Sequence, residues 1–124
     1  MIVAHFDGDR IGPRLELLLL EEQLEEAKAY SNAVEQAMLA LRDSLVEHVG
    51  ATIHVCGGDD LIASVPDETI SMGAIEKLRQ EFHSLCGQSI SVGIGASARS
   101  AVHNLRRAKL LGGDRVISDV HTLK

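Results

Sequence analysis

Three aspartates occupy positions from which carboxylates can do metal chemistry. Asp7 follows a short apolar run, and Asp59 and Asp60 stand side by side in the stretch HVCGGDDLIASVP. Carboxylates repel one another, so gathering three of them in one place indicates that divalent cations lie between them. Mg²⁺ prefers oxygen ligands from a few carboxylates together with substrate phosphates. Two such ions about 4 Å apart would activate a hydroxyl and neutralise a phosphoryl transition state, which predicts phosphoryl transfer.

The same features also have plainer interpretations. A Gly-Gly pair is typical of hairpin turns, and adjacent aspartates at a surface turn usually only face water. The stretch DGDRIG matches part of a calcium loop, but Ile11 and Leu18 stand where that loop needs oxygen ligands. Phosphoryl transfer therefore requires that Asp7 meets Asp59 and Asp60 in the fold.

The elements that must bring these aspartates together follow from the pattern of apolar residues. Strands are expected over 2–6, 52–56, 61–65, 89–97 and 114–118, and helices over 14–49, 70–85 and 98–113. The two strands around the Gly-Gly-Asp-Asp turn form a hairpin. A hairpin inside crossover connections predicts an α+β, ferredoxin-like palm, with helices packed on a central, mostly antiparallel sheet. In this arrangement the first strand and the hairpin are neighbours, so Asp7 can reach the hairpin aspartates.

The helical pattern over 14–49 is long for so small a protein. Apolar residues, Leu17, Leu20 and Leu24 among them, recur every three or four positions. The run is either one bent helix or two helices joined near 30–32. Packing of this stripe on the sheet is the expected use, and contact with a partner is the alternative.

Composition indicates one compact domain over residues 1–124. Of these residues 45% are hydrophobic and only 2% aromatic, so stacking platforms for single-stranded nucleic acid are lacking. The net charge of −6 argues against duplex binding. The two cysteines have no paired spacing, the start has no cationic leader, and no apolar run could cross a bilayer. We expect a soluble, cytoplasmic protein without membrane or direct nucleic-acid contact.

Three motifs occur together in a characteristic order. They are FDGDRIG at the end of the first strand, GGDDLIASVP across the hairpin, and RSAVHNLRRAKLLGGDRVI near the end of the chain. Over nearly the whole chain, their order and spacing resemble the palm domain of the GGDEF and CRISPR polymerase superfamily. The Gly-Gly-Asp-Asp form is similar to the polymerase subunit of type III CRISPR systems and, at this size, to the minimal CRISPR polymerases called mCpol.

The resemblance implies which residues hold a metal, Mg²⁺ or Mn²⁺. Asp7 matches the ligand of the first strand, and the carbonyl of Gly8 is a candidate additional ligand. Asp59 and Asp60 match the ligands of the hairpin. All three aspartates are thereby implied to be catalytic.

The resemblance also implies which residues hold the nucleotide. Three consecutive backbone amides would bind the triphosphate, those of Asp9, Arg10 and Ile11. Lys109 matches the lysine of a late Ala-Lys-x-x-Gly signature, which contacts terminal phosphates. Gly57 and Gly58 allow positive φ and let a nucleotide approach the backbone closely.

Departures from the superfamily pattern bear on the base. Diguanylate cyclases of the GGDEF type read guanine with an Asn and an Asp shortly after the first motif, and here Leu15 stands at the Asn position. A leucine side chain can neither donate nor accept a hydrogen bond, so guanine recognition of that kind is lost. Together with Leu61 after Asp60, and Gly113-Asp114 where an arginine often follows the late glycine, this favours the CRISPR-type branch. The resemblance to that branch implies ATP as the substrate and a cyclic di- or oligoadenylate as the product. One product that the family makes is 2',3'-cyclic di-AMP, and the family is associated with anti-phage signalling.

Cyclisation bears on the oligomeric state, because one palm holds one activated nucleotide. A homodimer with two facing palms is therefore expected. Three alternatives stay open: a diguanylate-type cyclase with altered base choice, a catalytically inactive nucleotide-binding sensor, and an assembly module that works through the leucine-rich helix.

Overall fold

The computed structural model describes residues 1–66 and 70–120. The elements are β1 (Ile2–Gly8), α1 (Ile11–Leu20), α2 (Leu24–Ser44), a π-helical segment η1 (Leu45–Val49), β2 (Thr52–Cys56), β3 (Asp60–Val65), α3 (Met72–Cys86), β4 (Ile90–Gly95), α4 (Ala98–Leu110) and β5 (Val116–Ser118). The predicted order of strands and helices is confirmed.

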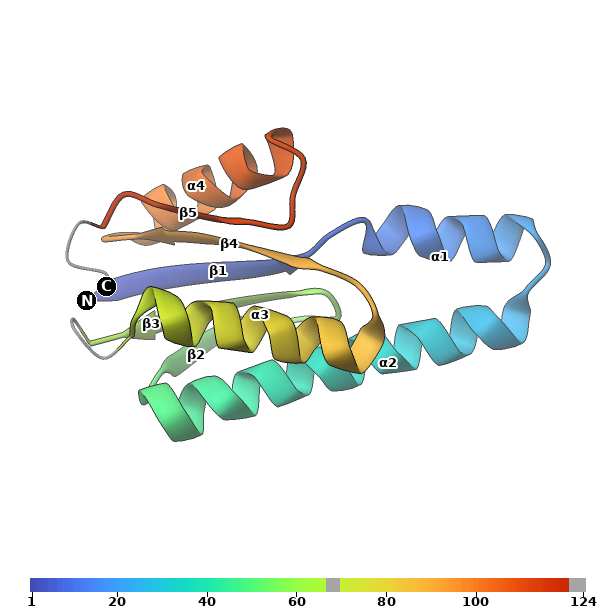
Figure 1. The fold of residues 1–124 in the computed structure, drawn as a ribbon, viewed down its shortest axis with the longest axis horizontal. Helices are drawn as coiled ribbons and strands as arrows, with labels where there is room; N and C mark the ends of the chain where they lie inside the picture. Colours follow the sequence, from blue (N-terminus) through green and yellow to red (C-terminus); the bar gives the residue numbers. More distant parts are fainter. Residues whose placement is uncertain (67–69, 121–124) are drawn as a thin grey trace.

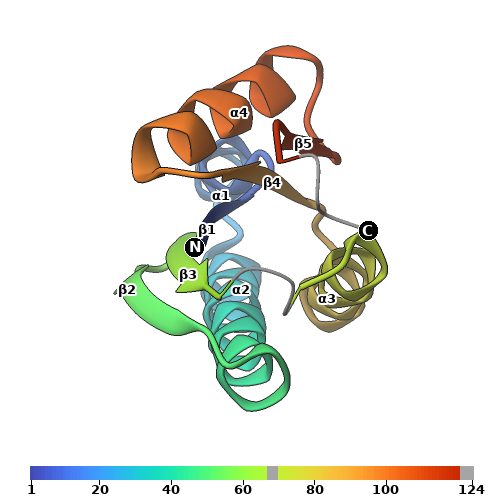
Figure 2. The same cartoon turned by 90° about the vertical axis from the view of Figure 1, so that its left-hand side faces the viewer.

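The five strands form one mixed sheet in the order β2-β3-β1-β4-β5. β1 is antiparallel to both β3 and β4, and β2 is antiparallel to β3. Among the described strands, only β5, at one edge, runs parallel to its neighbour β4. Helices α2 and α3 cover one face of the sheet and α4 covers the other (Figures 1 and 2). The predicted α+β palm fold, with the hairpin next to the first strand, is therefore confirmed.

The core lies between the sheet and the pair α2 and α3. Phe6 of β1 packs there in one cluster with Met38 of α2, Leu45 of η1 and Phe82 of α3. Successive residues of a strand point to opposite faces, so Asp7 leaves the sheet on the side opposite Phe6. The alternation along β1 thus buries its aromatic residue and presents the neighbouring carboxylate on the face that α4 partly covers.

The long helical run breaks at a different place from the one predicted. α1 ends at Leu20 and α2 begins at Leu24, and Glu22 between them is left-handed with φ of 60°. The predicted junction near 30–32 was wrong, because those residues lie inside α2. Three consecutive polar residues, 21–23, offer no apolar side chain for packing, and the chain reverses there to form the helical pair seen at one end of Figure 1.

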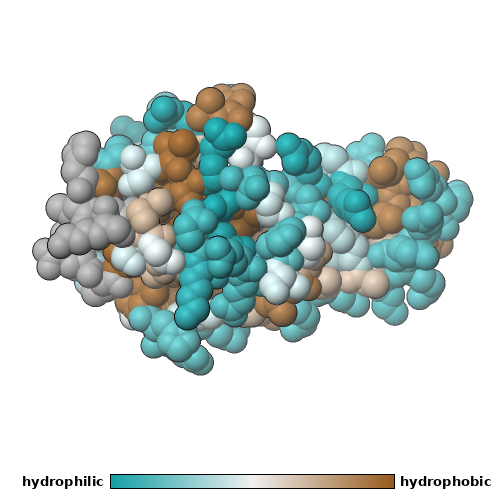
Figure 3. Space-filling view, in the orientation of Figure 1, coloured by the Kyte–Doolittle hydropathy of each residue, from teal (hydrophilic) through white to brown (hydrophobic). Residues whose placement is uncertain are grey.

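The apolar stripe packs on the sheet over only part of its length. From Ala27 onward its residues are buried, as expected. Leu17, Leu20 and Leu24 are instead 52%, 73% and 63% exposed, so the expectation was wrong for them. α1 contains no buried residue and extends away from the sheet together with the start of α2 (Figure 1). Figure 3 shows hydrophobic residues gathered at this end of the molecule.

The described helices are not membrane spans. Within 1–66 and 70–120, none combines the length and the apolar character that crossing a bilayer requires.

Candidate active site

The ends of β1 and β3 bring the predicted aspartates to one place. Asp7 and Asp60 are directly paired across these antiparallel strands, so their side chains leave the same face of the sheet. The amide of Gly8 donates to the carbonyl of Asp59 at 2.8 Å. Residues about fifty positions apart in the chain therefore meet at the hairpin, as the phosphoryl-transfer interpretation requires.

The pKa of Asp7 responds to burial and to the charges of the neighbouring residues. Burial raises the pKa of Asp7 most strongly, the charge and hydrogen bond of Lys109 lower it, and the charges of Asp59 and Asp60 raise it again. The net result is a pKa above the ordinary value. Added positive charge next to Asp7 would stabilise its ionised form.

Lys109 supplies one positive charge at this place. Its ammonium donates to the carbonyls of Asp7 and Gly8 at 3.0 and 2.9 Å and to Oδ1 of Asp9 at 2.8 Å. It also lies 3.2 Å from Oδ2 of Asp7. A lysine from α4, about a hundred residues later, is thus held against the end of β1.

The donor atoms are suited to a hard divalent cation. The carboxylates of Asp7 and Asp60 and the carbonyl of Gly8 are oxygen donors, which is the set that Mg²⁺ prefers. In the described part of the chain, no three acidic, histidine or cysteine side chains form a ready metal cage. A site made of few carboxylates and completed by substrate phosphates is consistent with that finding. The ammonium of Lys109 already lies as a cation beside the Asp7 carboxylate and the Gly8 carbonyl, so these oxygens fit a divalent metal ion.

The side chain of Asp9 has a role that the sequence analysis did not find. It is only 2% exposed and accepts hydrogen bonds from Ser89 and Ser91 at 2.6 and 2.8 Å, from Lys109 at 2.8 Å, and from the amide of Asp114 at 2.9 Å. Its own amide, which the resemblance assigns to the triphosphate, donates to the carbonyl of Ser89. Asp9 therefore joins β1, β4, α4 and the turn after α4.

These hydrogen bonds govern the ionisation of Asp9. Burial alone would raise its pKa, but the bonds from Lys109, Ser89, Ser91 and the Asp114 amide outweigh burial, and the pKa lies below the ordinary value. Such a carboxylate stabilises the fold above its unfolded-state pKa, and this contribution is lost as the pH falls through the lower folded-state pKa.

We expect Asp9→Asn to lower the free energy of unfolding at pH 7 by about 2–4 kcal/mol, because donors around a buried anion lose their charged acceptor. Below about pH 4 the gap between wild type and variant should narrow. Urea unfolding followed by circular dichroism from pH 7 down to pH 3 measures both effects. Asp43→Asn is the control, since Asp43 is 58% exposed. A gap that stays constant over this pH range would contradict the assignment.

The two glycines before the hairpin aspartates have ordinary backbone conformations. Gly57 and Gly58 do not have positive φ, so the predicted conformational reason for them was wrong. A β-carbon on Gly57 would lie 3.0 Å from Oδ1 of Asp60, which explains a glycine beside the carboxylate.

The residues predicted to bind the triphosphate through their amides lie at the junction of β1 and α1. Arg10 is left-handed with φ of 56° and donates from its guanidinium to the carbonyl of Gly112. Ile11 begins α1, so its amide lies at a helix N-terminus.

His5 is a second residue that the sequence analysis did not assign to the site. Its Nε2 lies 3.3 Å from Oδ2 of Asp60, one strand away. Its Nδ1 is buried and has no hydrogen-bond partner among the described residues. The only signal in the sequence was its position two residues before Asp7, which places both side chains on one face. His5 restrains the carboxylate of Asp60 from the side opposite the hairpin turn.

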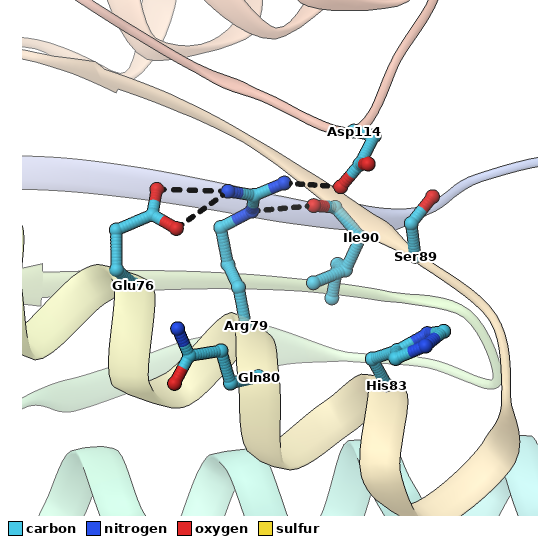
Figure 4. Close-up of a pocket in the computed structure, with 7 residues that line it drawn as sticks. All are labelled: Glu76, Arg79, Gln80, His83, Ser89, Ile90 and Asp114. Atoms are coloured by element: carbon cyan, nitrogen blue, oxygen red, sulfur yellow. Dashed lines mark hydrogen bonds and ion pairs between the residues drawn. The ribbon is translucent and has the colours of Figure 1, made fainter.

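A separate cavity of about 250 Å³ between α3 and the start of β4 contains none of the predicted site residues (Figure 4). Arg79 crosses it, donating to the carbonyl of Ile90 at 2.9 Å, to both oxygens of Glu76, and to Asp114. Each of the three guanidinium nitrogens of Arg79 therefore donates to a protein group. Since the Asp114 amide holds Asp9, Arg79 braces the far side of the candidate site.

Several solved structures share the fold of this chain. The Csm1-Csm4 cassette in complex with cA4 has a TM-score of 0.69 and 19% identity, over 93% of this chain and 20% of that chain. The active GGEEF domain of a diguanylate cyclase from Vibrio cholerae has a TM-score of 0.60 and 13% identity, over 97% of this chain and 83% of that chain. A DinB family error-prone DNA polymerase from Sulfolobus solfataricus has a TM-score of 0.64 and 16% identity, over 98% of this chain and 48% of that chain. At such identities the likeness concerns the fold.

The chain spans about a fifth of the Csm1-Csm4 chain that it matches. None of the curated proteins matches it. The family model described as mCpol, minimal CRISPR polymerase domain, matches residues 3–118 and thus includes every predicted site residue. The shared palm fold and this match lead to one conclusion: the chain belongs to the mCpol family of minimal CRISPR polymerase domains.

Proposed function

We propose that the protein is a nucleotidyltransferase that condenses ATP into a cyclic di- or oligoadenylate, such as 2',3'-cyclic di-AMP, and acts in anti-phage signalling. One observation carries the proposal. Asp7 and Asp60 are paired across β1 and β3, and the ammonium of Lys109 lies 3.2 Å from the Asp7 carboxylate. The predicted metal ligands and the predicted phosphate-binding cation thus meet in one place.

The reaction assigns tasks to residues at the end of β1 and at the β2–β3 turn. Asp7, Asp59, Asp60 and the Gly8 carbonyl would hold Mg²⁺ or Mn²⁺. When bound, the metal lowers the pKa of the attacking hydroxyl and neutralises charge on the phosphate. A ribose hydroxyl of one nucleotide forms a bond to the α-phosphorus of another and gives its proton to water. The α–β phosphoanhydride bond breaks, and pyrophosphate leaves with the electron pair.

A phosphate-binding region lies beside these ligands. A cavity of about 110 Å³ is lined by Asp9, Arg10, Lys109, Gly112 and Gly113, and two of these side chains are cationic. The N-terminus of α1 opens next to it at Ile11. Unpaired amides and the positive end of a helix dipole favour an anion. We therefore assign the triphosphate to the amides of Arg10 and Ile11 and to the Lys109 ammonium.

A cavity of about 190 Å³ beside Asp59 supports the choice of base. It is lined by Ile11, Leu15, Tyr30, Ser31, Val34, Glu35, Gly58 and Asp59. The Tyr30 hydroxyl donates to Gln88 and its ring packs under the Arg14 guanidinium, so the ring is held in place. A mostly apolar cavity with a few polar groups is suited to a purine. Leu15 lies in the wall of this cavity, where it provides no partner for the polar edge of guanine.

Solved structures that share the fold also support an adenine nucleotide as substrate. Csm1-Csm4 cassettes have been solved in complex with one ATP, with pppApA and with cA4. We infer an adenine nucleotide for this chain as well. Since one palm would activate one nucleotide, closing a ring calls for a second palm, and we propose a homodimer. The exposed Leu17 and Leu20 of α1 and Leu24 of α2 offer apolar surface for protein contact, which also favours assembly through this helical pair.

The direct test is turnover by the purified protein. Each of the four nucleoside triphosphates is incubated with Mg²⁺ or Mn²⁺, and products are resolved by chromatography and identified by mass. A cyclic adenylate and pyrophosphate from ATP are expected. A cyclic guanylate would favour the diguanylate-type alternative. Binding of nucleotide without product in either metal would leave the inactive sensor.

Leu15→Asn should change the base preference of the enzyme. The amide introduces a donor and an acceptor where the diguanylate cyclases have one, so we expect the ratio of GTP to ATP affinity to rise by about tenfold. Competition of GTP and ATP against a fluorescent ATP analogue measures this ratio. Leu15→Ala is the control, because it enlarges the cavity without adding a polar group. An equal change in both variants would contradict the assignment of this cavity to the base.

A further inference from the structure

We propose that Lys109 is a resident counter-cation of the metal site: without nucleotide its ammonium binds the oxygens of Asp7 and Gly8, and metal binding requires it to leave them. This inference rests on the proposed function, because it takes these oxygens as metal ligands. It adds a competition between a side chain and the metal, in addition to the phosphate contact expected of Lys109.

The contacts of the ammonium define the competition. Lys109 Nζ lies within 3.2 Å of four oxygens: the Asp7 and Gly8 carbonyls, Oδ2 of Asp7 and Oδ1 of Asp9. An ammonium has only three protons, so it is saturated by this set. Two of the four oxygens, the Asp7 carboxylate and the Gly8 carbonyl, are predicted metal ligands. A divalent cation bound to them would lie next to the ammonium, and the two like charges would repel strongly.

Lys109 can leave these oxygens without losing all of its contacts. Its side chain is 29% exposed and ends in a flexible four-carbon stem. Asp9, at 2.8 Å, is not a predicted metal ligand, and its other hydrogen bonds hold it in place. The phosphate-binding cavity is lined by Asp9 and Lys109 together with Arg10. The ammonium can therefore remain beside Asp9 while it turns from the metal ligands toward a triphosphate.

This exchange couples the two ligands. Nucleotide phosphates draw the ammonium away from Asp7 and Gly8, which frees these oxygens for the metal. Metal affinity is consequently low without nucleotide and higher with it, and by linkage the metal strengthens nucleotide binding to the same extent. Lys109 is the positioning residue for this coupling, and it keeps the carboxylates partly neutralised when the site has no substrate.

The test measures Mn²⁺ binding alone, by titration calorimetry and by the loss of the free-ion paramagnetic resonance signal. Lys109→Met should bind Mn²⁺ about tenfold more tightly than the wild type. Arg107→Met removes the same charge from the same helix, at an exposed residue about 200° further round. It should change the affinity by less than about twofold. If Lys109→Met binds no more tightly than wild type, or if Arg107→Met gains as much, the proposal is wrong.

A second variant and a nucleotide analogue complete the Mn²⁺ titration. Lys109→Gln keeps a polar partner for Asp9, so it provides the neutral variant if Lys109→Met unfolds, and it should show the same gain. A non-hydrolysable ATP analogue should raise Mn²⁺ affinity in the wild type more than in either variant; equal gains would overturn the coupling. Cyclic product with unchanged Mn²⁺ affinity would refute this inference alone. The Mn²⁺ gain without any product from ATP would refute only the proposed cyclase activity.

Discussion

Asp60→Asn is expected to reduce formation of cyclic product from ATP by at least about 10³-fold, because a neutral amide cannot replace an anionic metal ligand worth several kcal/mol in the transition state. The fold should survive, since the Asp60 side chain is 37% exposed and asparagine has the same shape. Asp7→Asn and Asp59→Asn should reduce formation of cyclic product by a similar factor. Product analysis at saturating ATP and Mg²⁺ measures the loss, and thermal unfolding monitors the fold.

The control is again Asp43→Asn, which removes one carboxylate from the surface of α2 and should keep full turnover. Mn²⁺ titration separates catalysis from binding, because loss of a ligand should weaken metal affinity along with turnover. A folded Asp60→Asn variant that still makes product at a rate close to wild type would exclude this carboxylate as a metal ligand, and with it the proposed mechanism.

Gly93→Ala is expected to produce the largest loss of stability, at least about 3 kcal/mol, with a fall in Tm of roughly 10 °C or more. A β-carbon at Gly93 would lie 2.1 Å from the carbonyl oxygen of Ala101 and 2.2 Å from the amide nitrogen of Leu105. Both are backbone atoms of α4, so the whole helix would have to move away from β4. That movement would also strain the buried bond from Asn104 to the Ile94 carbonyl, which is 2.8 Å long.

Gly73→Ala is the matched control for the extra methyl group. Its nearest heavy atom would be Oγ of Ser71 at 3.9 Å, and Gly73 lies in the first turn of α3. Alanine in a helix is favoured by up to about 1 kcal/mol, so this variant should be as stable as the wild type or slightly more so. Thermal and urea unfolding compare the two. Similar behaviour of both variants would contradict the close packing of α4 on β4.

Close packing of α4 also matters for the site, because α4 carries Lys109. The absence of a side chain at Gly93 lets the helix lie directly on the sheet, and only at that distance does the Lys109 ammonium reach the carbonyls at the end of β1. A partly folded Gly93→Ala variant should therefore lose activity beyond its loss of stability. The glycines of β4 thus connect the packing of the fold to the chemistry.

The sequence by itself determined the order of the elements, the hairpin and the neighbourhood of Asp7 with Asp59 and Asp60. These features follow from local periodicity and from turn residues, which act over a few positions, and from the limited number of ways in which a hairpin joins a first strand. The match of the family over residues 3–118 agrees with that interpretation.

Only the tertiary structure decided the break at residues 21–23, the exposure of Leu17 and its neighbours, and the contacts of Asp9 with Ser89, Ser91 and Lys109. A periodic pattern states which face of a helix is apolar but not how far the sheet extends beneath it. Likewise, the bonds from Ser89 and Ser91 to Asp9 depend on the pairing of β4 with β1, and the bond from Lys109 to Asp9 depends on the distance at which α4 packs on β4. That distance is set by three-dimensional contact of backbones, for which no local stretch of sequence holds the information.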